Sequence, residues 1–131
     1  MEIEAVPSWD DYTPLAVAGE GAYGTVYLAR CKQSNHLVAI KRVEQALLVK
    51  VFKIGAALRE KEILTEIGDL PFAISLRKTF KDGEHLYFVL EHCPFGTIGA
   101  LAAVFPDSRL PEHMAAFYAA EIVVFLHHLH R

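Results

Sequence analysis

The sequence predicts an α+β fold in which five antiparallel strands and two helices are followed by two further helices. β-Branched and aromatic residues form short runs before residue 44 and again over 74–91, a pattern typical of strands. Apolar residues recur at intervals of three and four over 47–67 and from 97 onward, which is the spacing of one helix face. An Asp-Gly pair between the last two strand-like runs favours a hairpin.

The first three strands are expected to form an antiparallel meander. Residues 15–18 are apolar and lead into a glycine turn. In the segment 23–30, alternation predicts that Val26 faces the core and Tyr27 faces outward. After a polar break, residues 37–43 form the third strand, in which apolar residues are interrupted by one lysine.

A lead-in and two helices flank these strands. The acidic opening predicts a solvated, unpacked lead-in over 1–13, so that the domain covers 14–131. The apolar spacing over 47–67 predicts one short and one longer helix, with Gly55 as the break and Gly68 as the stop.

Two strands and two helices complete the chain. Residues 74–80 and 85–91 are the strands of the Asp-Gly hairpin. Helical spacing returns over 97–104 and again from Pro111, which suits the first position of a helix. The last helix carries a wide apolar stripe, which we expect to cause self-association or aggregation: Met114, Phe117, Tyr118, Ile122, Phe125, Leu126 and Leu129.

The composition excludes several classes of function. Thirteen Lys and Arg against sixteen Asp and Glu give a net charge of −3, which supplies no basic stripe for nucleic acid. The longest stretch without these residues, 92–106, is shorter than the roughly 20 apolar residues that cross a membrane. The acidic start lacks the basic region of a secretory signal, so we expect a cytoplasmic or nuclear protein. Cys31 and Cys93 have no CxxC partner, which predicts reduced thiols.

A glycine-rich motif follows the first strand. Gly19, Gly21 and Gly24 fit the pattern GxGxxGxV, whose small residues let backbone N–H groups approach phosphate oxygens. A dinucleotide-binding fold uses a similar pattern, but it needs a helix to begin at the glycines. Here strand-forming residues follow instead. A plain glycine-rich hairpin turn is the alternative for this motif alone.

The third strand carries a lysine in the sequence VAIK. Lys41 follows the apolar residues Val38, Ala39 and Ile40 and lies seventeen residues after Gly24. A lysine in such a strand is either an edge or snorkelling lysine, or a group that binds an anion. Its place one strand after the glycine motif favours a phosphate-binding role.

A glycine loop, a VAIK strand and an acid-bearing helix, in this order, resemble the opening of a protein kinase. The resemblance covers nearly the whole chain after Pro14 and is closest to the cyclic-nucleotide-dependent (AGC) group of serine/threonine kinases. The sequences that carry this narrower resemblance are LREKEIL at 58–64, the short helix before it, LPFAISLRKTFKDGEHLYFVLEH at 70–92 and LPEHMAAFYAAEIVVFLHHLH at 110–130. It implies a kinase-like small lobe over 14–90, a hinge over 91–96 and the start of a large lobe over 97–131.

The resemblance also implies roles for individual residues. Lys41 would contact the α- and β-phosphates of ATP, and Glu60 would pair with it. Glu62 lies about 200° around the helix from Glu60, so we expect it to be solvated. The remaining nucleotide-binding positions are Val26 and Ala39, which would sandwich adenine, Leu90 at the back of the pocket, and the hinge from Glu91 to Cys93. Ordinary core packing is the alternative for Val26, Ala39 and Leu90.

Three positions depart from the family pattern. Ala18 stands where a larger aliphatic residue usually covers adenine, Thr97 where an acid usually meets the ribose, and Phe95 where glycine is usual. We therefore expect modest nucleotide affinity.

The chain carries neither an HRDxxxxN nor a DFG segment, which supply the catalytic Asp and the magnesium ligands of kinases. We expect no catalytic residue here, a truncated domain that is inactive in isolation, and Mg²⁺ binding only with large-lobe residues. His127 and His130 could share a helix face, but no third metal ligand has suitable spacing. The absence of GxSxG argues against a hydrolase.

By resemblance, the function is ATP-dependent phosphorylation of protein Ser or Thr, with ATP and a protein substrate as partners of the complete kinase. The alternative is a non-catalytic module that binds a hydrophobic-motif peptide in a groove beside the small-lobe sheet.

Overall fold

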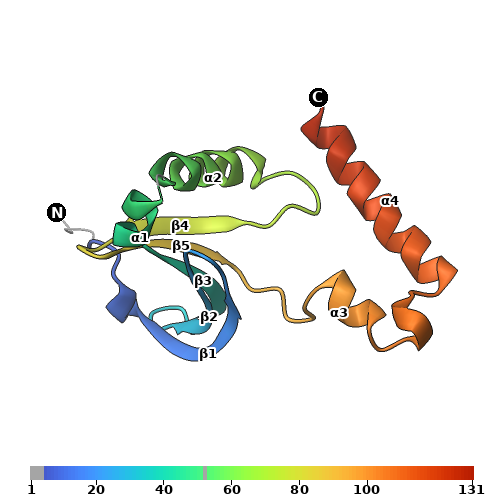
Figure 1. The fold of residues 1–131 in the computed structure, drawn as a ribbon, viewed down its shortest axis with the longest axis horizontal. Helices are drawn as coiled ribbons and strands as arrows, with labels where there is room; N and C mark the ends of the chain where they lie inside the picture. Colours follow the sequence, from blue (N-terminus) through green and yellow to red (C-terminus); the bar gives the residue numbers. More distant parts are fainter. Residues whose placement is uncertain (1–4, 52) are drawn as a thin grey trace. The chain divides into compact units, whose positions relative to one another are not determined.

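A five-stranded antiparallel sheet is the centre of the computed structural model, which describes residues 5–51 and 53–131 (Figure 1). The strand order is β1-β2-β3-β5-β4. The strands are β1 (Tyr12–Glu20), β2 (Gly24–Cys31), β3 (Leu37–Glu44), β4 (Leu76–Lys81) and β5 (His85–Glu91). The predicted fold class, five antiparallel strands with helices, is confirmed.

The chain divides into two compact units. The first unit comprises the chain up to Glu66 together with Ile74–His92, and it contains the whole sheet. The second unit comprises Ile67–Ala73 and Cys93–Arg131.

Two helices of the first unit belong to one face of the sheet, here called the inner face (Figure 1). They are α1 (Gln45–Lys50) and α2 (Ile54–Ile67). Leu48 of α1 and Ala57 of α2 are buried in one cluster with Val43 and Phe88 of the sheet. Removing these apolar side chains from water, at roughly 25 cal/mol per Å², holds the helices on this face.

The break between these helices does not lie at Gly55, so that prediction is wrong. Gly55 is the second residue of α2. Instead, α1 ends after Lys50, where the Val51 N–H donates to the Leu47 carbonyl and the Lys53 N–H to the Leu48 carbonyl. A glycine in the first turn of a helix interrupts no continuing helix, because that turn's N–H groups have no intrahelical partner.

The opposite face, here called the outer face, is covered by the N-terminal segment. A 3-10 turn, Trp9–Asp11, is closed by a capping box at Ser8, and strand β1 begins directly after it with Tyr12, which is 4% exposed. The predicted unpacked lead-in over 1–13 is therefore corrected at Trp9 and Tyr12, while its first four residues lie outside the described residues. Tyr27, which alternation predicts to face outward, packs edge-on against Trp9 on this face.

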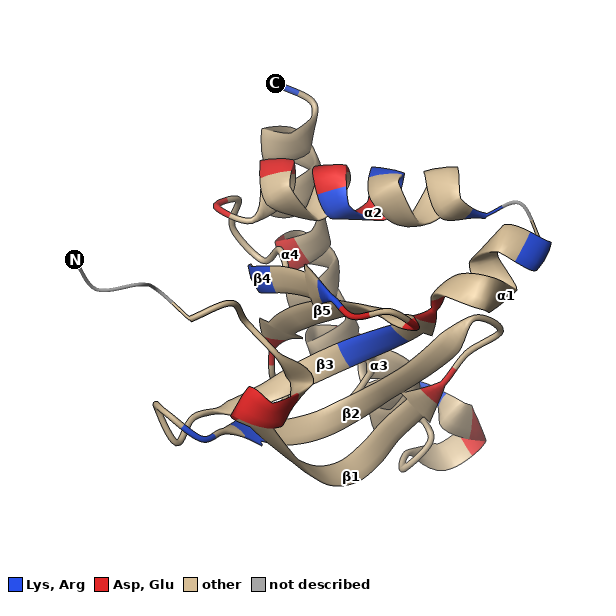
Figure 2. Ribbon diagram, turned by 90° about the vertical axis from the view of Figure 1, so that its left-hand side faces the viewer, with Lys and Arg blue, Asp and Glu red and all other residues tan. Residues whose placement is uncertain are grey.

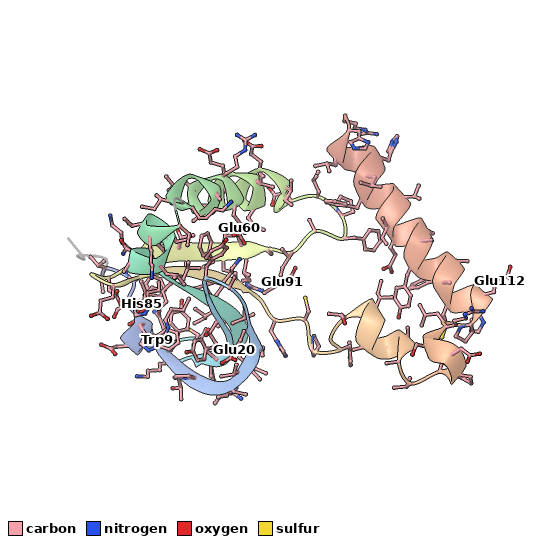
Figure 3. The ribbon with its side chains drawn as sticks, in the orientation of Figure 1. Trp9, Glu20, Glu60, His85, Glu91 and Glu112 are labelled. Atoms are coloured by element: carbon pink, nitrogen blue, oxygen red, sulfur yellow. The ribbon has the colours of Figure 1, made fainter. Side chains whose placement is uncertain are left out.

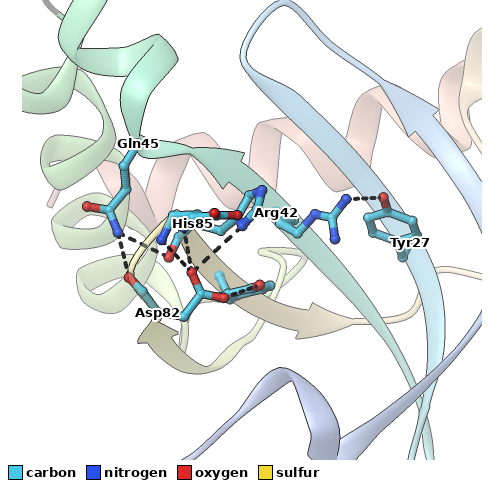
Figure 4. Close-up of polar contacts among 7 residues, drawn as sticks. Tyr27, Arg42, Gln45, Asp82 and His85 are labelled. Carbon is cyan, nitrogen blue, oxygen red and sulfur yellow. Dashed lines mark hydrogen bonds and ion pairs between the residues drawn. The ribbon is translucent and has the colours of Figure 1, made fainter.

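The hairpin between β4 and β5 is organised by Asp82. Its Oδ1 accepts from the N–H groups of Glu84, at 2.8 Å, and His85, at 2.7 Å, and its Oδ2 accepts from the Tyr87 hydroxyl at 2.7 Å (Figure 4). Gln45 donates to the Asp82 carbonyl at 2.9 Å. The Asp82 carboxylate therefore accepts the hydrogen bonds of the turn that the Asp-Gly pair predicted.

The second unit contains α3 (Ile98–Ala102), a 3-10 turn (Pro106–Ser108) and α4 (Glu112–Leu129). Thr97 caps α3 by accepting from the Ala100 N–H at 3.0 Å, and Pro111 precedes α4 as its N-cap. No residue of α4 is buried, and in Figure 2 this helix shows few charged residues. Among residues 5–51 and 53–131, no helix combines the length and the apolar character that crossing a membrane requires.

Candidate functional site

An ion pair joins β3 to α2 in the first unit. The Lys41 Nζ donates to both carboxylate oxygens of Glu60, at 2.8 and 3.1 Å. The two side chains are 35% and 41% exposed, and in Figure 3 Glu60 lies on the side of α2 that faces the sheet. The structure thus brings together the two charged residues that the resemblance paired.

The register of the sheet explains why Lys41 faces α2. Lys41 lies between Val26 of β2 and Phe88 of β5, and residues directly opposite each other point to the same face. Phe88 is buried against Ala57 of α2, so the row Val26, Lys41 and Phe88 belongs to the inner face.

Glu62 takes no part in this pair. Its nearest basic group is Arg59, whose Nη1 lies 3.6 Å from Oε2, and both side chains are mostly exposed. Figure 2 shows α2 banded with both charge signs. An exposed pair of this kind contributes little stability.

The glycine motif forms the turn between β1 and β2. The Gly21 N–H donates to the Gly24 carbonyl at 2.9 Å, and Gly24 pairs with Val43 of β3. A Cβ at Gly24 would overlap the carbonyl oxygen of Arg42 and lie 2.9 Å from its carbonyl carbon. Gly24 is therefore required for close contact between the loop and β3.

The other two glycines border open space. A Cβ at Gly19 would meet no heavy atom within 4 Å, and one at Gly21 would meet only the Gly24 carbonyl oxygen at 3.7 Å. This open backbone, one strand away from the Lys41 cation, leaves room for an anionic group to approach main-chain N–H donors.

A second row of inner-face residues lies next to Lys41. Ala39 is opposite Leu28 on β2 and Leu90 on β5. All three residues, like Val26, are half-buried, whereas their outer-face neighbours Ala29, Ile40 and Val89 are nearly inaccessible. The predicted adenine-facing residues thus form a partly open apolar surface. Leu28 belongs to it and was absent from the prediction.

The predicted hinge residues fall on both sides of the division between the units. Glu91 ends β5 in the first unit, where its carboxylate accepts from the Ser75 N–H at 2.8 Å and its own N–H donates to the Ser75 carbonyl at 3.0 Å. Cys93 is exposed and belongs to the second unit. The departures Ala18 and Phe95 are both exposed, Phe95 at 96%.

Within the described ranges, no group of three His, Cys, Asp or Glu side chains could hold a metal ion. The His128 Nδ1 lies 2.8 Å from the Val124 carbonyl oxygen of its own helix. Both cysteines are free thiols, and a hydrogen bond from Ser34 lowers the pKa of Cys31.

Sequence reasoning missed a group of residues behind the site. Arg42 follows Lys41 directly and lies on the outer face, close to Trp9 and Tyr27. Two signals in the sequence could have indicated it. Neighbouring cations in a strand must point to opposite faces, and the only tryptophan of the chain stands in the supposedly unpacked lead-in.

Comparison with known proteins adds a family match. The protein kinase domain family model matches residues 12–131. The serine/threonine-protein kinase ppk22 of Schizosaccharomyces pombe is 34% identical over 98% of this chain, which covers 24% of that protein. The kinase nrc-2 of Neurospora crassa is 34% identical over 91% of the chain and 19% of its own length. Human MRCK gamma is 33% identical over 93% of the chain and 8% of its own length. The chain thus spans a quarter or less of these relatives.

Proposed function

The chain belongs to the protein kinase family and corresponds to the N-terminal portion of a serine/threonine kinase domain, and we propose that this portion binds ATP. The glycine turn and Lys41 bind the phosphates, and the half-buried row around Ala39 contacts adenine. Glu91, at the end of β5, presents its backbone to the edge of the base. The AGC grouping, which the resemblance of residues 58–64 supports, is part of this proposal.

The ion pair between Lys41 and Glu60 carries the proposal. An ammonium group has three donors, and Glu60 accepts from Lys41 through both carboxylate oxygens. The pair is only partly exposed, so the carboxylate holds the ammonium in place on the inner face. A cation fixed in this way beside an open glycine turn can bind a phosphate without first being ordered, which lowers the entropic cost of binding.

Transfer of the terminal phosphate to a protein Ser or Thr is the activity that we propose for the complete domain. That step needs a carboxylate to orient the hydroxyl and ligands for Mg²⁺. This chain contributes the positioning of ATP, while Mg²⁺ and protein substrate require large-lobe residues. The free thiols of Cys31 and Cys93 suit a reducing compartment, which supports a cytoplasmic or nuclear location.

Calorimetric titration with ATP tests the proposal. Lys41→Met removes the cation and is expected to weaken binding by about 1 to 3 kcal/mol, or roughly 5- to 150-fold. Equal affinity of the wild type and this variant contradicts the proposal.

A matched pair of acid variants tests the role of Glu60. Glu60→Gln is expected to weaken ATP binding less than Lys41→Met does, because Lys41 keeps its charge and its own contact with phosphate. Glu62→Gln is the control, since its carboxylate pairs with the exposed Arg59 and takes no part in the Lys41 ion pair. A larger loss of ATP affinity for Glu62→Gln than for Glu60→Gln contradicts the assignment of Glu60 as the partner of Lys41.

A groove on the first unit supports a second function, binding of a hydrophobic-motif peptide. The groove has a volume of about 340 Å³. Its lining comes from α2, β4 and β5: Ala57, Leu58, Lys61, Thr79, Phe80, Lys81, Leu86, Tyr87 and Phe88. Lys61 and Lys81 add positive charge to an otherwise mainly apolar lining. Thermal-shift titration with aromatic hydrophobic-motif peptides is expected to stabilise the wild type, and Leu58→Glu is expected to abolish that shift while preserving the shift with ATP.

A further inference from the structure

Trp9 contacts three strands on the outer face of the sheet. Its ring lies 5.4 Å from that of Tyr27 on β2, edge-on at 63°, and 5.4 Å from that of Tyr87 on β5, stacked at 26°. The guanidinium carbon of Arg42, on β3, lies 5.4 Å from the centre of the Trp9 ring. We call these four residues, Trp9, Tyr27, Arg42 and Tyr87, the Trp9 clamp. Figure 3 shows Trp9 beside this face of the sheet.

Arg42 is held from more than one direction in the Trp9 clamp. Its guanidinium carbon lies 5.0 Å from the centre of the Tyr27 ring, and its Nη2 donates to the Tyr27 hydroxyl at 2.7 Å (Figure 4). A guanidinium group suits this place because it is planar, stacks on aromatic rings and remains charged. The clamp therefore fixes the position of β2 relative to β3.

The segment that carries Trp9 is itself tethered. The Ser8 N–H donates to the Asp11 carboxylate at 2.9 Å, and the Asp10 N–H donates to the Ser8 hydroxyl at 3.2 Å. The Asp11 carbonyl accepts from the Lys32 N–H, just after β2, at 2.9 Å. Trp9 is thus presented to the sheet by a closed turn.

The clamp lies directly behind the site of the proposed function. Tyr27 follows Val26 on β2, and Arg42 follows Lys41 on β3, while Val26 and Lys41 are opposite each other in the sheet. Because successive side chains of a strand point to opposite faces, the same backbone carries the clamp outside and the Lys41 row inside. The Arg42 carbonyl is also the group against which Gly24 packs.

We propose that Trp9 and Arg42 are positioning residues for the nucleotide site, through which the N-terminal segment controls the affinity for ATP. The inference rests on the proposed ATP binding at Lys41. When the clamp is closed, β2 and β3 hold the glycine turn and Lys41 in the arrangement that receives phosphate. When Trp9 leaves the sheet, this arrangement is no longer enforced. Part of the free energy of ATP binding must then be used to order the glycine turn and Lys41. Coupling of this kind is reciprocal, so ATP must in turn hold Trp9 against the sheet.

ATP affinity of clamp variants in the full chain gives the first test. Trp9→Ala is expected to weaken ATP binding about 5-fold or more, within the usual range of coupling between sites. Trp9→Phe keeps a ring over Arg42 and is expected to restore most of the affinity. Val89→Ala is the matched control, because Val89 lies in the same outer-face cluster and is absent from the clamp.

Arg42→Lys gives a second test with a milder change. Lysine keeps the charge but loses the planar group that lies against both rings, so affinity is expected to fall although the net charge is unchanged. This variant also serves if Trp9→Ala fails to fold.

Trp9 fluorescence gives a spectroscopic test, because Trp9 is the only tryptophan in the chain. Quenching by acrylamide is expected to decrease when ATP is added to the wild type, and to stay unchanged in Lys41→Met. ATP binding with unchanged quenching, or Trp9→Ala and Arg42→Lys affinities within twofold of the wild type, overturns the clamp proposal while the proposed function stands. A wild type that binds no ATP by calorimetry overturns both.

Discussion

At the scale of single residues, adjacent positions of one strand have different tasks. Lys41 and Arg42 are neighbours with the same charge, yet Lys41 pairs with a carboxylate on the inner face and Arg42 contacts two aromatic rings on the outer face. The alternation of side chains keeps the two cations apart. Lysine and arginine are therefore not interchangeable at these two positions, because only Arg42 uses a planar guanidinium group.

Gly24 offers a prediction at this scale. Gly24→Ala places a methyl group where the Arg42 carbonyl oxygen stands, so either the loop or β3 must move. The expected cost is about 1 to 3 kcal/mol of stability, typical of overpacking, measured by denaturant unfolding. Gly19→Ala is the control, because its Cβ would meet nothing within 4 Å. Equal stability of the two variants contradicts the close contact.

At the scale of elements, the β4–β5 hairpin depends on a carboxylate that must stay ionised. The hydrogen bond from the Tyr87 hydroxyl, together with those from the Glu84 and His85 N–H groups, lowers the pKa of Asp82 from 3.8 to about 2. Burial, and the hydrogen bond to Asp82, raise the pKa of Tyr87 to about 12. The hydrogen bond thus favours an ionised Asp82 and a protonated Tyr87 at neutral pH.

The pH dependence of the hairpin follows from this shift. A carboxyl group with a depressed folded-state pKa contributes stability above its unfolded pKa and loses it as the pH falls through the folded value. We expect the contribution of Asp82 to be complete above pH 3.8 and to disappear near pH 2. NMR titration of the Asp82 carboxyl carbon measures this pKa directly. Tyr87→Phe keeps the ring and removes the hydroxyl, and is expected to move the pKa of Asp82 upward. An unchanged pKa in that variant contradicts the assigned cause.

Helix α4 is an element without a buried residue. Phe117 is 60% exposed, and Ile122, Leu126 and Leu129 are each at least 40% exposed. Full burial of one such side chain is worth about 1.5 to 3 kcal/mol, so we expect the isolated chain to self-associate. Light scattering at tens of micromolar is expected to show oligomers, and a chain ending at Asp107 is expected to be more monodisperse.

Variants within α4 test whether its apolar face, rather than another part of the helix, causes self-association. Ile122 and Leu126 are one turn apart and share a face. Ile122→Gln combined with Leu126→Gln is expected to reduce self-association, whereas Glu121→Gln leaves the apolar face intact and is expected to change nothing. A monodisperse wild type with protected amides from Ile122 to Leu129 contradicts the prediction.

At the scale of the whole molecule, nucleotide positioning and phosphoryl transfer are separate requirements. The first unit contains the glycine turn, Lys41 and Glu60, but the sequence has no HRDxxxxN or DFG segment. We therefore predict no phosphate transfer by these 131 residues, because they lack the carboxylate that orients the acceptor hydroxyl and the carboxylate that binds Mg²⁺. Radiolabel transfer to a generic Ser/Thr substrate measures this. Incorporation above the blank that is abolished by Lys41→Met contradicts the prediction.

The sequence by itself determined the features that depend on local order along the chain. Alternation and turn chemistry predicted β5 over 85–91 and the Asp-Gly hairpin, and the structure has that strand as His85–Glu91. The 100° step between helical residues places Glu60 and Glu62 on different sides of the helix, and the resemblance to protein kinases selected Glu60. Such patterns are readable because hydrogen bonding and side-chain direction within one element repeat with a fixed period.

Only the tertiary structure decided which distant side chains meet. Trp9 packs against strands far along the chain, so an acidic opening that looks unpacked by composition contains the residue that covers the outer face. The break between α1 and α2 precedes Gly55, which lies in the first turn of α2, where a glycine interrupts no helix; Leu48 and Ala57 pack both helices against the sheet. Gly24 is critical and Gly19 is not, because only Gly24 lies against the Arg42 carbonyl. Contacts between distant residues depend on strand register and packing, which no local period specifies.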